Sequence, residues 1–434
     1  MNTACDRIAR LIRDRRGALL ATTALALPVI AGFAGLGVEV GMWYSDKRDL
    51  QTAADAAALS GAFERVRGNP NGLQSAARHE AQRNGFQIGG PNTIAVNNPP
   101  LSGSRAGETT AVEVVLTRPH RLLFSTLLLS DDMTIAARST AAVDTTGEAC
   151  VLALDRTANR ALNNQGSSTV LMDGCVMASN SIAPDAIYLG GSTTVNAFSL
   201  WTSGGLVNGG SGNVTLARPA TTHAWDLDDP LADFDMGAVP ACSPNPPYET
   251  RYGSGARTIE PGVYCGELKF NAGADITMKP GRYYVADGDF HVNGSARVRC
   301  DCPNPEDGVT IILTKKNTST IGRVDIRAGA DVQLRAPSDP TNPFRGVLFY
   351  QDRTAPVNTT GVHQFNGGAT MRLEGSIYMP QQGVEFSGNN SASKTCTQII
   401  ARTVSFTGNA YIDNTACQAA GVQPVTVTQA RLVE

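Results

Sequence analysis

The side chains that could carry out catalysis are scattered through this sequence, and few occur at the spacing that a reaction needs. Asp287 and Asp289 are two residues apart, so on a strand both carboxylates would face one side, as in a β-helical glycosidase or lyase. The same Asp-Gly-Asp sequence is an ordinary turn, which is the interpretation we favour. The five histidines are isolated, and neither a Gly-x-Ser-x-Gly motif nor a phosphate-binding loop occurs. We therefore predict no catalytic residue and no enzyme activity.

Two other groups of side chains could bind a metal ion. The segment from His223 to Gly237 carries five aspartates, whose oxygens are ligands that Ca²⁺ prefers. Its spacing differs from that of an EF-hand loop, and Pro230 interrupts it, so we expect a solvated linker before the main repeats. Cys300 and Cys302 could bind Zn²⁺, but no Cys-x-x-Cys motif and no nearby histidine accompany them. We predict no metal site and no cofactor.

The nine cysteines are divided by a long apolar run near the N-terminus: Cys5 precedes it and eight follow it. An even number on the far side fits an oxidising compartment, where cysteines form disulfides. Neighbouring cysteines would each enclose about one of the repeats described below. The pairs are Cys150–Cys175, Cys242–Cys265 and Cys396–Cys417. A disulfide between Cys300 and Cys302 would close a very small ring, and we leave this pair open.

The element that would position the rest of the chain is this apolar run of 21 uncharged residues, Ala18 to Val38. As a helix it would be about 31 Å long, which matches the hydrocarbon core of a bilayer. Five arginines lie in the seventeen residues before it, whereas one lysine and one arginine lie in the twenty residues after it. This asymmetry places a basic segment, residues 1–17, in the cytoplasm and the chain after the helix outside.

We therefore predict an uncleaved, single transmembrane helix over residues 18–41. Arg15 and Arg16 would lie at one membrane interface, and Trp43 and Tyr44 in the aromatic belt at the other. A cleaved signal peptide is an alternative, but its apolar region is only about 7–15 residues long. A buried soluble helix is another, but it gives the arginines no role.

Small residues within and beside this helix suggest further features. Gly37 and Gly41 have the Gly-x-x-x-Gly spacing that allows a second helix to pack closely in lipid. Glu39 would fall at the membrane edge, where we expect it to be solvated. Cleavage by a prepilin peptidase after Gly17 would favour a glutamate where Thr22 stands, so we do not predict it.

The stretch from Arg15 to Ala62 resembles the N-terminal module of TadG-like proteins, which belong to the tight-adherence (Flp) pilus assembly machinery of bacteria. The resembling features are the Arg-Arg-Gly start, the anchor, the Trp-Tyr pair and the helix AADAAALSGA. A looser similarity continues to about residue 145. The resemblance implies a component held in the bacterial inner membrane, with its C-terminal part periplasmic or extracellular. Its implied partners are that membrane and other pilus-assembly proteins.

Many members of this family carry a von Willebrand factor A-like domain with a metal-dependent adhesion motif, Asp-x-Ser-x-Ser. That motif does not occur in this sequence. Adhesion through a metal ion is therefore not implied, and the C-terminal part of the chain needs another explanation.

A small α+β module is predicted after a helical stalk at residues 42–66. The stalk would present Leu50, Ala54, Ala57 and Gly61 on one face, and the module would span residues 67–147. Its predicted elements are a helix at 73–84 that ends at Gly85, a strand at 110–117 that Pro119 stops, an amphipathic helix at 121–129 and a strand at 133–143.

From residue 148 to 434 one short pattern recurs: an apolar residue, one or two small polar residues, glycine, and a second apolar residue. Its copies recur at about 20 residues, with loops inserted in two of them, and two further copies lie upstream, at Leu189 and Val207. Such a unit cannot bury its apolar residues alone, so copies must stack. We expect the first apolar residue of each copy to form an inward ladder. These residues are Phe270, Val292, Ile326, Phe365, Phe386 and Phe406.

The predicted fold is therefore mainly β: a transmembrane helix, a small α+β module, and an extracytoplasmic β-solenoid of the right-handed parallel β-helix type. A β-sandwich is the alternative. The net charge of −3 excludes a general phosphate-binding face, so no nucleic-acid partner is expected.

Two functions compete on this basis. The first is a non-catalytic component of pilus assembly or surface adhesion, whose solenoid faces another protein or a surface polymer. The second is a protein that binds or cleaves polysaccharides at the cell surface. An enzyme of that kind should show clustered charged residues on one stacked face, whereas the repeat sequences show Asn, Ser, Thr and Gly. We favour the first.

Overall fold

The structure is a computed structural model in which the chain forms two compact units. One comprises Met1–Thr145 with Thr428–Glu434, and the other comprises Thr146–Val427. The described residues are 16–120, 122–127, 133–242, 249–316, 321–358, 360–366, 371–388, 396–413, 421–422 and 424–434. The final residues thus belong to the first unit, whereas the sequence interpretation placed all residues after 147 with the β-rich part.

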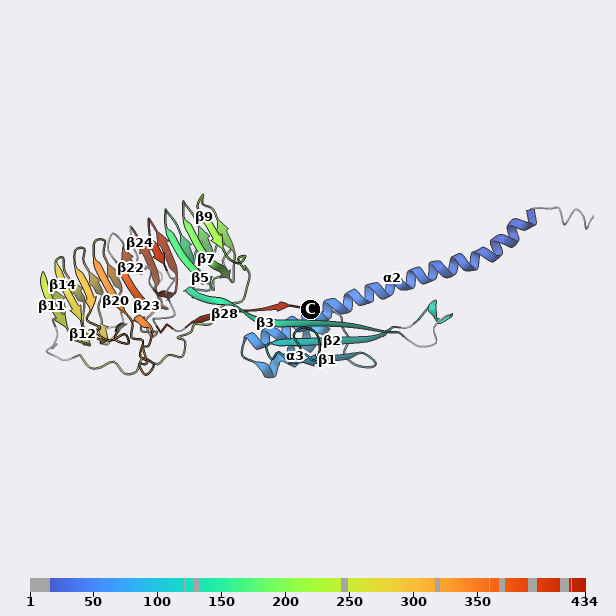
Figure 1. The fold of residues 1–434 in the computed structure, drawn as a ribbon, viewed down its shortest axis with the longest axis horizontal. Coiled ribbons are helices and arrows are strands. Elements are labelled where there is room, and N and C mark those ends of the chain that lie inside the picture. Colours follow the sequence, from blue (N-terminus) through green and yellow to red (C-terminus); the bar gives the residue numbers. More distant parts are fainter. Residues whose placement is uncertain are drawn as a thin grey trace, which may run out of the picture. The chain divides into compact units, whose positions relative to one another are not determined.

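A single long helix, α2 (Arg16–Val66), dominates the first unit (Figure 1). It has 51 residues and joins the predicted membrane span to the predicted stalk without a break, with Pro28 inside it. Alanine and leucine, which favour helix, make up much of it. From Thr22 onward it is long and apolar enough to cross a membrane.

The second half of α2 packs on a small sheet and is not a solvated stalk. Antiparallel strands β1 (Thr93–Asn97), β2 (Ala111–His120) and the first part of β3 (Met133–Ala153) form this sheet. Leu50, Ala54 and Ala57 are buried against it, which confirms the predicted face. Along the chain, η1 (Pro70–Gly72) and α3 (Leu73–Arg83) come between α2 and β1. Gly85 follows α3 with a positive φ of 86°.

Two predictions for this unit were wrong. Pro119 does not stop its strand, because β2 continues to His120 and Pro119 lies opposite Thr134 of β3. β1 pairs with β2 only as far as Thr117, so Pro119 has no neighbour on its other side and its missing N–H leaves no gap. The predicted helix at 121–129 is a single 3₁₀ turn, η2 (Ser125–Leu127), in the described residues; residues 121 and 128–132 lie outside them.

The second unit is built from parallel strand ladders. In the first ladder, ten strands pair in parallel. In stacking order they are β10 (Arg251–Tyr252), β13 (Leu268–Phe270), β16 (Phe290–Val292), β19 (Val324–Ile326), β22 (Val362–Asn366), β24 (Gly383–Ser387), β26 (Val404–Thr407), β4 (Leu162–Asn164), β6 (Ile187–Leu189) and β8 (Leu206–Asn208).

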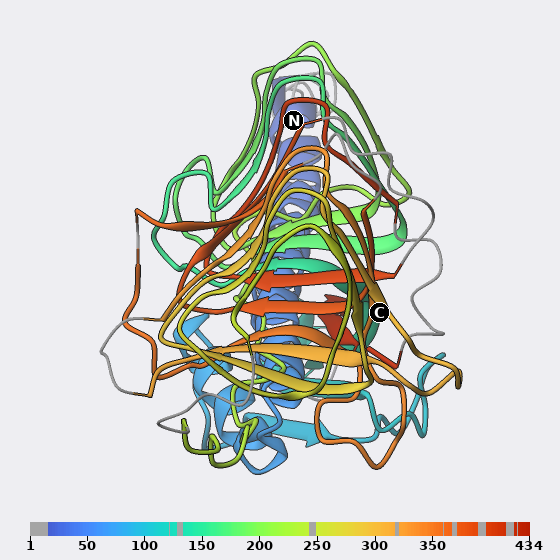
Figure 2. The ribbon, with the colours of Figure 1, turned by 90° about the vertical axis from the view of Figure 1, so that its left-hand side faces the viewer.

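Two further ladders run beside it. The second contains β11 (Gly255–Ile259), β14 (Ala274–Met278), β17 (Arg297–Cys300), β20 (Asp331–Arg335) and the start of β23 (Met371–Met379). The third contains β12 (Gly262–Cys265), β15 (Gly281–Ala286), β18 (Val309–Thr314), β21 (Val347–Gln351), the end of β23, β25 (Thr397–Ala401), the end of β3, and the ends of β5 (Thr169–Ser179) and β7 (Thr194–Thr202). Each turn of the chain contributes strands to these ladders in sequence, and the turns overlie one another in Figure 2.

The remaining strands complete the element order. β27 (Tyr411–Asp413) pairs in parallel with the start of β5, and β9 (Asn213–Leu216) pairs in parallel with the start of β7. β28 (Val425–Leu432) returns the chain to the first unit. All strand pairs within the three ladders of the second unit are parallel, whereas a β-sandwich is built from antiparallel strands.

The predicted inward ladder is confirmed. Its six residues lie opposite one another in turn, from Phe270 through Val292, Ile326, Phe365 and Phe386 to Phe406. All are buried. The rings of Phe365 and Phe386 stack with their centroids 4.8 Å apart. Asn164 continues the same row beyond Phe406, followed by Leu189.

The order of the turns in space differs from their order in the sequence. β26 is followed in the stack by β4, and β25 by the end of β3. The chain therefore enters the stack in its middle, builds outward to β9, and restarts at β10 at the far end. Figure 1 shows β9 and β11 at opposite ends of the unit. The upstream repeats at 189 and 207 thus stack beyond the last repeats, and Val207 lies one position out of register with the ladder.

Candidate functional site

The outer end of the predicted membrane span contains a polar tie that the sequence interpretation missed. Glu39, expected to be solvated, is fully buried. One carboxylate oxygen accepts hydrogen bonds from the N–H of Leu123 (2.7 Å) and the hydroxyl of Ser125 (2.9 Å). The other accepts from the N–H groups of Phe124 (3.0 Å) and Ser125 (2.7 Å). These donors lie about 85 residues downstream, so no local pattern in the sequence indicates them.

The predicted aromatic belt residues have different surroundings. Trp43 packs against the core of the first unit and lies edge-on to His120, with ring centroids 6.2 Å apart. Tyr44, the next residue, is exposed. Tyr44 is therefore free to lie at a membrane interface, whereas the Trp43 side chain packs in the core of the first unit. Arg15 lies outside the described residues, as does the side chain of Arg16.

The two glycines of the predicted packing motif face open space. No described atom lies within 4 Å of the position that a Cβ would take on Gly37 or Gly41. A second helix could therefore approach there as predicted, and helix pairing stays a prediction.

Two of the three cysteine pairs that neighbour pairing predicts are bonded in the described residues of the second unit. Cys150 is bonded to Cys175 and Cys242 to Cys265. Cys300 and Cys302, which the sequence left open, are bonded to each other. Cys396 is also in a disulfide, and its predicted partner Cys417 lies outside the described residues.

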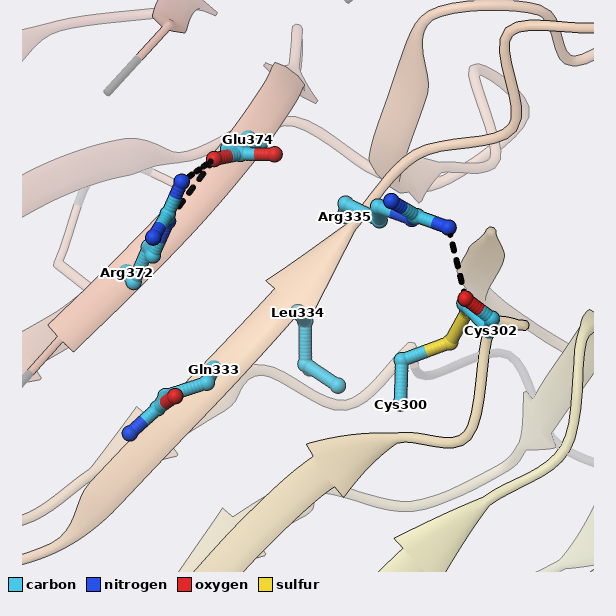
Figure 3. A pocket seen from close by; sticks show the side chains of 7 residues that line it. All are labelled: Cys300, Cys302, Gln333, Leu334, Arg335, Arg372 and Glu374. Carbon is cyan, nitrogen blue, oxygen red and sulfur yellow. Dashed lines mark hydrogen bonds and ion pairs between the residues drawn. A yellow bond between two sulfur atoms is a disulfide. The ribbon is translucent and has the colours of Figure 1, made fainter. Parts of the chain in front are cut away.

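The disulfide between Cys300 and Cys302 borders an open pocket of about 300 Å³ on the outer side of the second ladder (Figure 3). Its other lining residues are Gln333, Leu334, Arg335, Arg372 and Glu374. The Arg335 guanidinium donates to the carbonyl oxygens of Cys302 and Asp307, both at 2.8 Å. Arg372 donates to Glu374 at 2.8 Å. The charged groups of the pocket are thus engaged with the protein itself.

The same outer face carries stacked charges at one position of three successive repeats. Asp275, Arg297 and Asp331 lie opposite one another on three successive strands. Arg297 contacts both carboxylates, at 3.8 and 3.3 Å, and Arg299 contacts Asp331 at 3.5 Å. The sequence interpretation gave the stacked face of the repeats Asn, Ser, Thr and Gly, and it overlooked these charges, which stand one residue before the second apolar residue of three successive copies.

The Asp-Gly-Asp sequence forms a turn, as favoured. Asp287 has a positive φ of 63°, and its carboxylate accepts from the N–H of Lys316 at 2.8 Å. Asp289 accepts from the N–H of Arg323 at 2.8 Å. Both carboxylates therefore fix the backbone of the next turn.

The acidic segment is not a solvated linker. We call residues 217–242 the strap, because they leave β9 and follow the side of the stack toward β10. Asn180 exchanges two hydrogen bonds of 2.8 Å with the backbone of Leu227. The Trp201 indole donates to the carbonyl of Trp225 at 3.0 Å. The apolar residues between its aspartates explain this position, since Leu227 and Leu231 are both buried.

One aspartate of the strap is tied to the third ladder. Asp229 accepts a hydrogen bond from the hydroxyl of Tyr378 at 2.8 Å and contacts the Arg353 guanidinium at 2.5 Å. Burial raises the pKa of the Asp229 carboxyl, against the lowering effects of the Leu231 N–H and Arg353. Among the described residues, no group of three His, Cys, Asp or Glu side chains could hold a metal ion.

A buried polar cluster lies between the first and third ladders. His363 is fully buried, and its Nδ1 accepts from the N–H of Val324 at 3.0 Å. Gln351 lies 3.4 Å from the other ring nitrogen and donates to Gln382 at 2.6 Å. Burial lowers the pKa of His363 to about 3, so the imidazole is neutral.

Comparison with known proteins bears on the first unit. Residues 17–64 match the family described as "Putative Flp pilus-assembly TadE/G-like". Neither a curated protein nor a solved structure matches the chain. The match covers most of α2, and together with the apolar character of this helix it fits a single-pass membrane protein. Residues 17–64 are therefore similar to the TadE/G-like Flp pilus-assembly family, as the resemblance predicted.

Proposed function

We propose that the protein is a membrane-anchored, non-catalytic component of Tad/Flp pilus assembly or surface adhesion, with its second unit outside the inner membrane. The match of residues 17–64 to the pilus-assembly family carries this proposal. The exposed apolar residues of α2 support it, since Leu25, Ile30 and Phe33 have no cover in the described chain. The disulfides support an oxidising compartment for the second unit.

The second unit would be a right-handed parallel β-helix. Its parallel ladders and the aligned Phe365, Phe386 and Phe406 support this class. The right-handed sense follows the strong preference of connections between parallel strands. Such a stack offers a long rigid face to a partner, which suits an assembly component.

Binding of a surface polysaccharide by this unit is the second candidate. The charged residues and the open pocket on the second ladder favour it. A pocket can hold a sugar ring, and charged side chains can hydrogen-bond to its hydroxyls. Cleavage has less support, because Asp275, Asp331 and Glu374 are all paired with arginines.

The proposal is tested by deleting the coding sequence in the bacterium that encodes the chain and restoring it in trans. Pili are sheared from the cells, and the pilin in the sheared fraction is measured. Loss of sheared pilin in the deletion strain and its return with the full chain would support the proposal. Unchanged pilin after deletion would overturn a role in assembly. If the deletion strain keeps its pilin but no longer binds purified surface polysaccharide, the second candidate is favoured.

A further inference from the structure

A short segment of the first unit, residues 122–126, lies beside the predicted membrane span. We call it the side loop. The ring of Phe124 covers Gly35 so closely that a Cβ on this glycine would lie 2.6 Å from a ring atom. Gly35 is six residues before the predicted outer end of the span at Gly41, which corresponds to about 9 Å along the helix. The side loop is therefore at the depth of the lipid interface if α2 spans the membrane.

The polar groups of the side loop are satisfied in a way that suits this depth. The N–H groups of Leu123, Phe124 and Ser125 precede or begin the η2 turn, so they have no partner within it. Glu39 accepts hydrogen bonds from all three at 2.7–3.0 Å. Backbone N–H groups near hydrocarbon need such internal partners, because water is scarce there. This also explains why an apolar helix carries a buried carboxylate at this position.

The side loop nevertheless presents apolar side chains outward. Leu123 is 58% exposed and Phe124 is 46% exposed, although their backbone is fixed. On α2, Phe33, Val38 and Val40 are exposed at the same level. The exposed apolar surface of the helix thus continues onto the side loop. A surface in water would not favour two adjacent, exposed, large apolar residues on a fixed backbone.

We propose that the side loop inserts into the outer-face interface of the membrane that holds α2, where Leu123 and Phe124 contact phospholipid acyl chains. The inference rests on the proposed anchoring of α2. The loop would be a second membrane contact, which fixes the rotation of α2 and its depth in the bilayer.

Photocrosslinking of the full chain in vesicles of phosphatidylethanolamine and phosphatidylglycerol tests this. Benzoylphenylalanine is placed singly at Leu123, at Phe33 or at Leu101, and lipid adducts are measured by mass spectrometry. Leu101 is the matched control, because it is an apolar loop residue of the same unit that is 77% exposed. The N–H of Leu101 donates a hydrogen bond to Glu113. The residue before Glu113, Val112, lies against Gly61 of α2, so Leu101 belongs to the part of the unit near Gly61. Gly61 is twenty residues, or about 30 Å, beyond Gly41 along the helix.

We expect lipid adducts at position 123 at a level comparable with position 33, and no lipid adducts at position 101. Adducts at position 33 alone would overturn the side-loop inference and leave the anchor intact. Absence of adducts at both 33 and 123 would overturn the anchor as well. Equal adducts at 101 would show unspecific contact and would also overturn the inference.

Discussion

At the scale of single residues, the inward row of the first ladder is the feature on which the second unit depends most. Phe365 is stacked between neighbours in the row and fully buried, whereas Gln364 on the same strand faces outward. Phe365→Ala should lower the free energy of unfolding by about 3–5 kcal/mol, because it leaves a cavity that the stacked strands cannot close. Gln364→Ala should change it by less than about 0.5 kcal/mol. Thermal unfolding followed by circular dichroism would measure both; equal midpoints would show that the row is not the core.

Asn164 occupies a position in this row where an apolar residue is expected. It is fully buried between Phe406 and Leu189, and both its amide nitrogen and its amide oxygen have no hydrogen-bond partner among the described residues. An unsatisfied buried amide costs about 1–3 kcal/mol, so Asn164→Leu should raise the free energy of unfolding. Denaturant titration of the two proteins measures the change. A lower midpoint for Asn164→Leu would mean that the amide makes contacts that stabilise the fold.

His363 should make the second unit sensitive to mild acid. Its folded pKa of about 3 is below the ordinary value of 6.5, because burial disfavours the charged ring. Below pH 6.5 the unfolded chain therefore binds a proton that the folded chain does not, and stability is lost by about 1.4 kcal/mol per pH unit. His363→Gln should flatten this slope between pH 6 and 4, whereas His223→Gln, at an exposed site, should not. An unchanged slope in His363→Gln would assign the acid sensitivity to other groups.

At the scale of elements, the strap behaves as part of the second unit. Leu231 is buried and Asp233, two residues on, is exposed. Leu231→Ala should loosen the strap and speed its cleavage in limited proteolysis, because opening then loses less buried apolar surface. Asp233→Ala should leave the cleavage rate unchanged. Rapid cleavage of the unaltered strap, at the rate of an unfolded peptide, would restore the interpretation as a solvated linker.

Elements whose signal is local could be predicted from the sequence. The row from Phe270 to Phe406 was predictable because stacking places matching repeat positions opposite one another. The helix face at Leu50 was predictable from its spacing. Two features had no local signal: the pairing of β26 with β4, more than 200 residues apart, and the tie between Glu39 and Ser125. The charged row on the second ladder did have a local signal, since Asp275, Arg297 and Asp331 stand at the same position of three successive repeats, but the repeat was defined only by its apolar, small polar and glycine positions.

At the scale of the whole molecule, the chain builds its stack from the middle. It enters at the end of β3, and the last turns return to cover that strand through β25. The end of β3 and β25 are therefore neighbours in the stack although they are far apart in the sequence. Parallel pairing over such separations forms late in folding, since the long loops must close first. The second unit should thus acquire its full structure only once the chain is complete to about residue 413.

The central claim is that this chain acts in pilus assembly from the membrane, and release of the anchor tests it most directly. Residues 1–41 are replaced by a cleavable signal peptide, so that the remaining chain is exported in soluble form into the same compartment. The sheared pilin of this strain is compared with that of the deletion strain carrying the full chain. The account predicts that only the anchored chain restores pili, because the TadE/G-like domain at residues 17–64 is then intact. Full restoration by the released chain, present at equal amount, would contradict it.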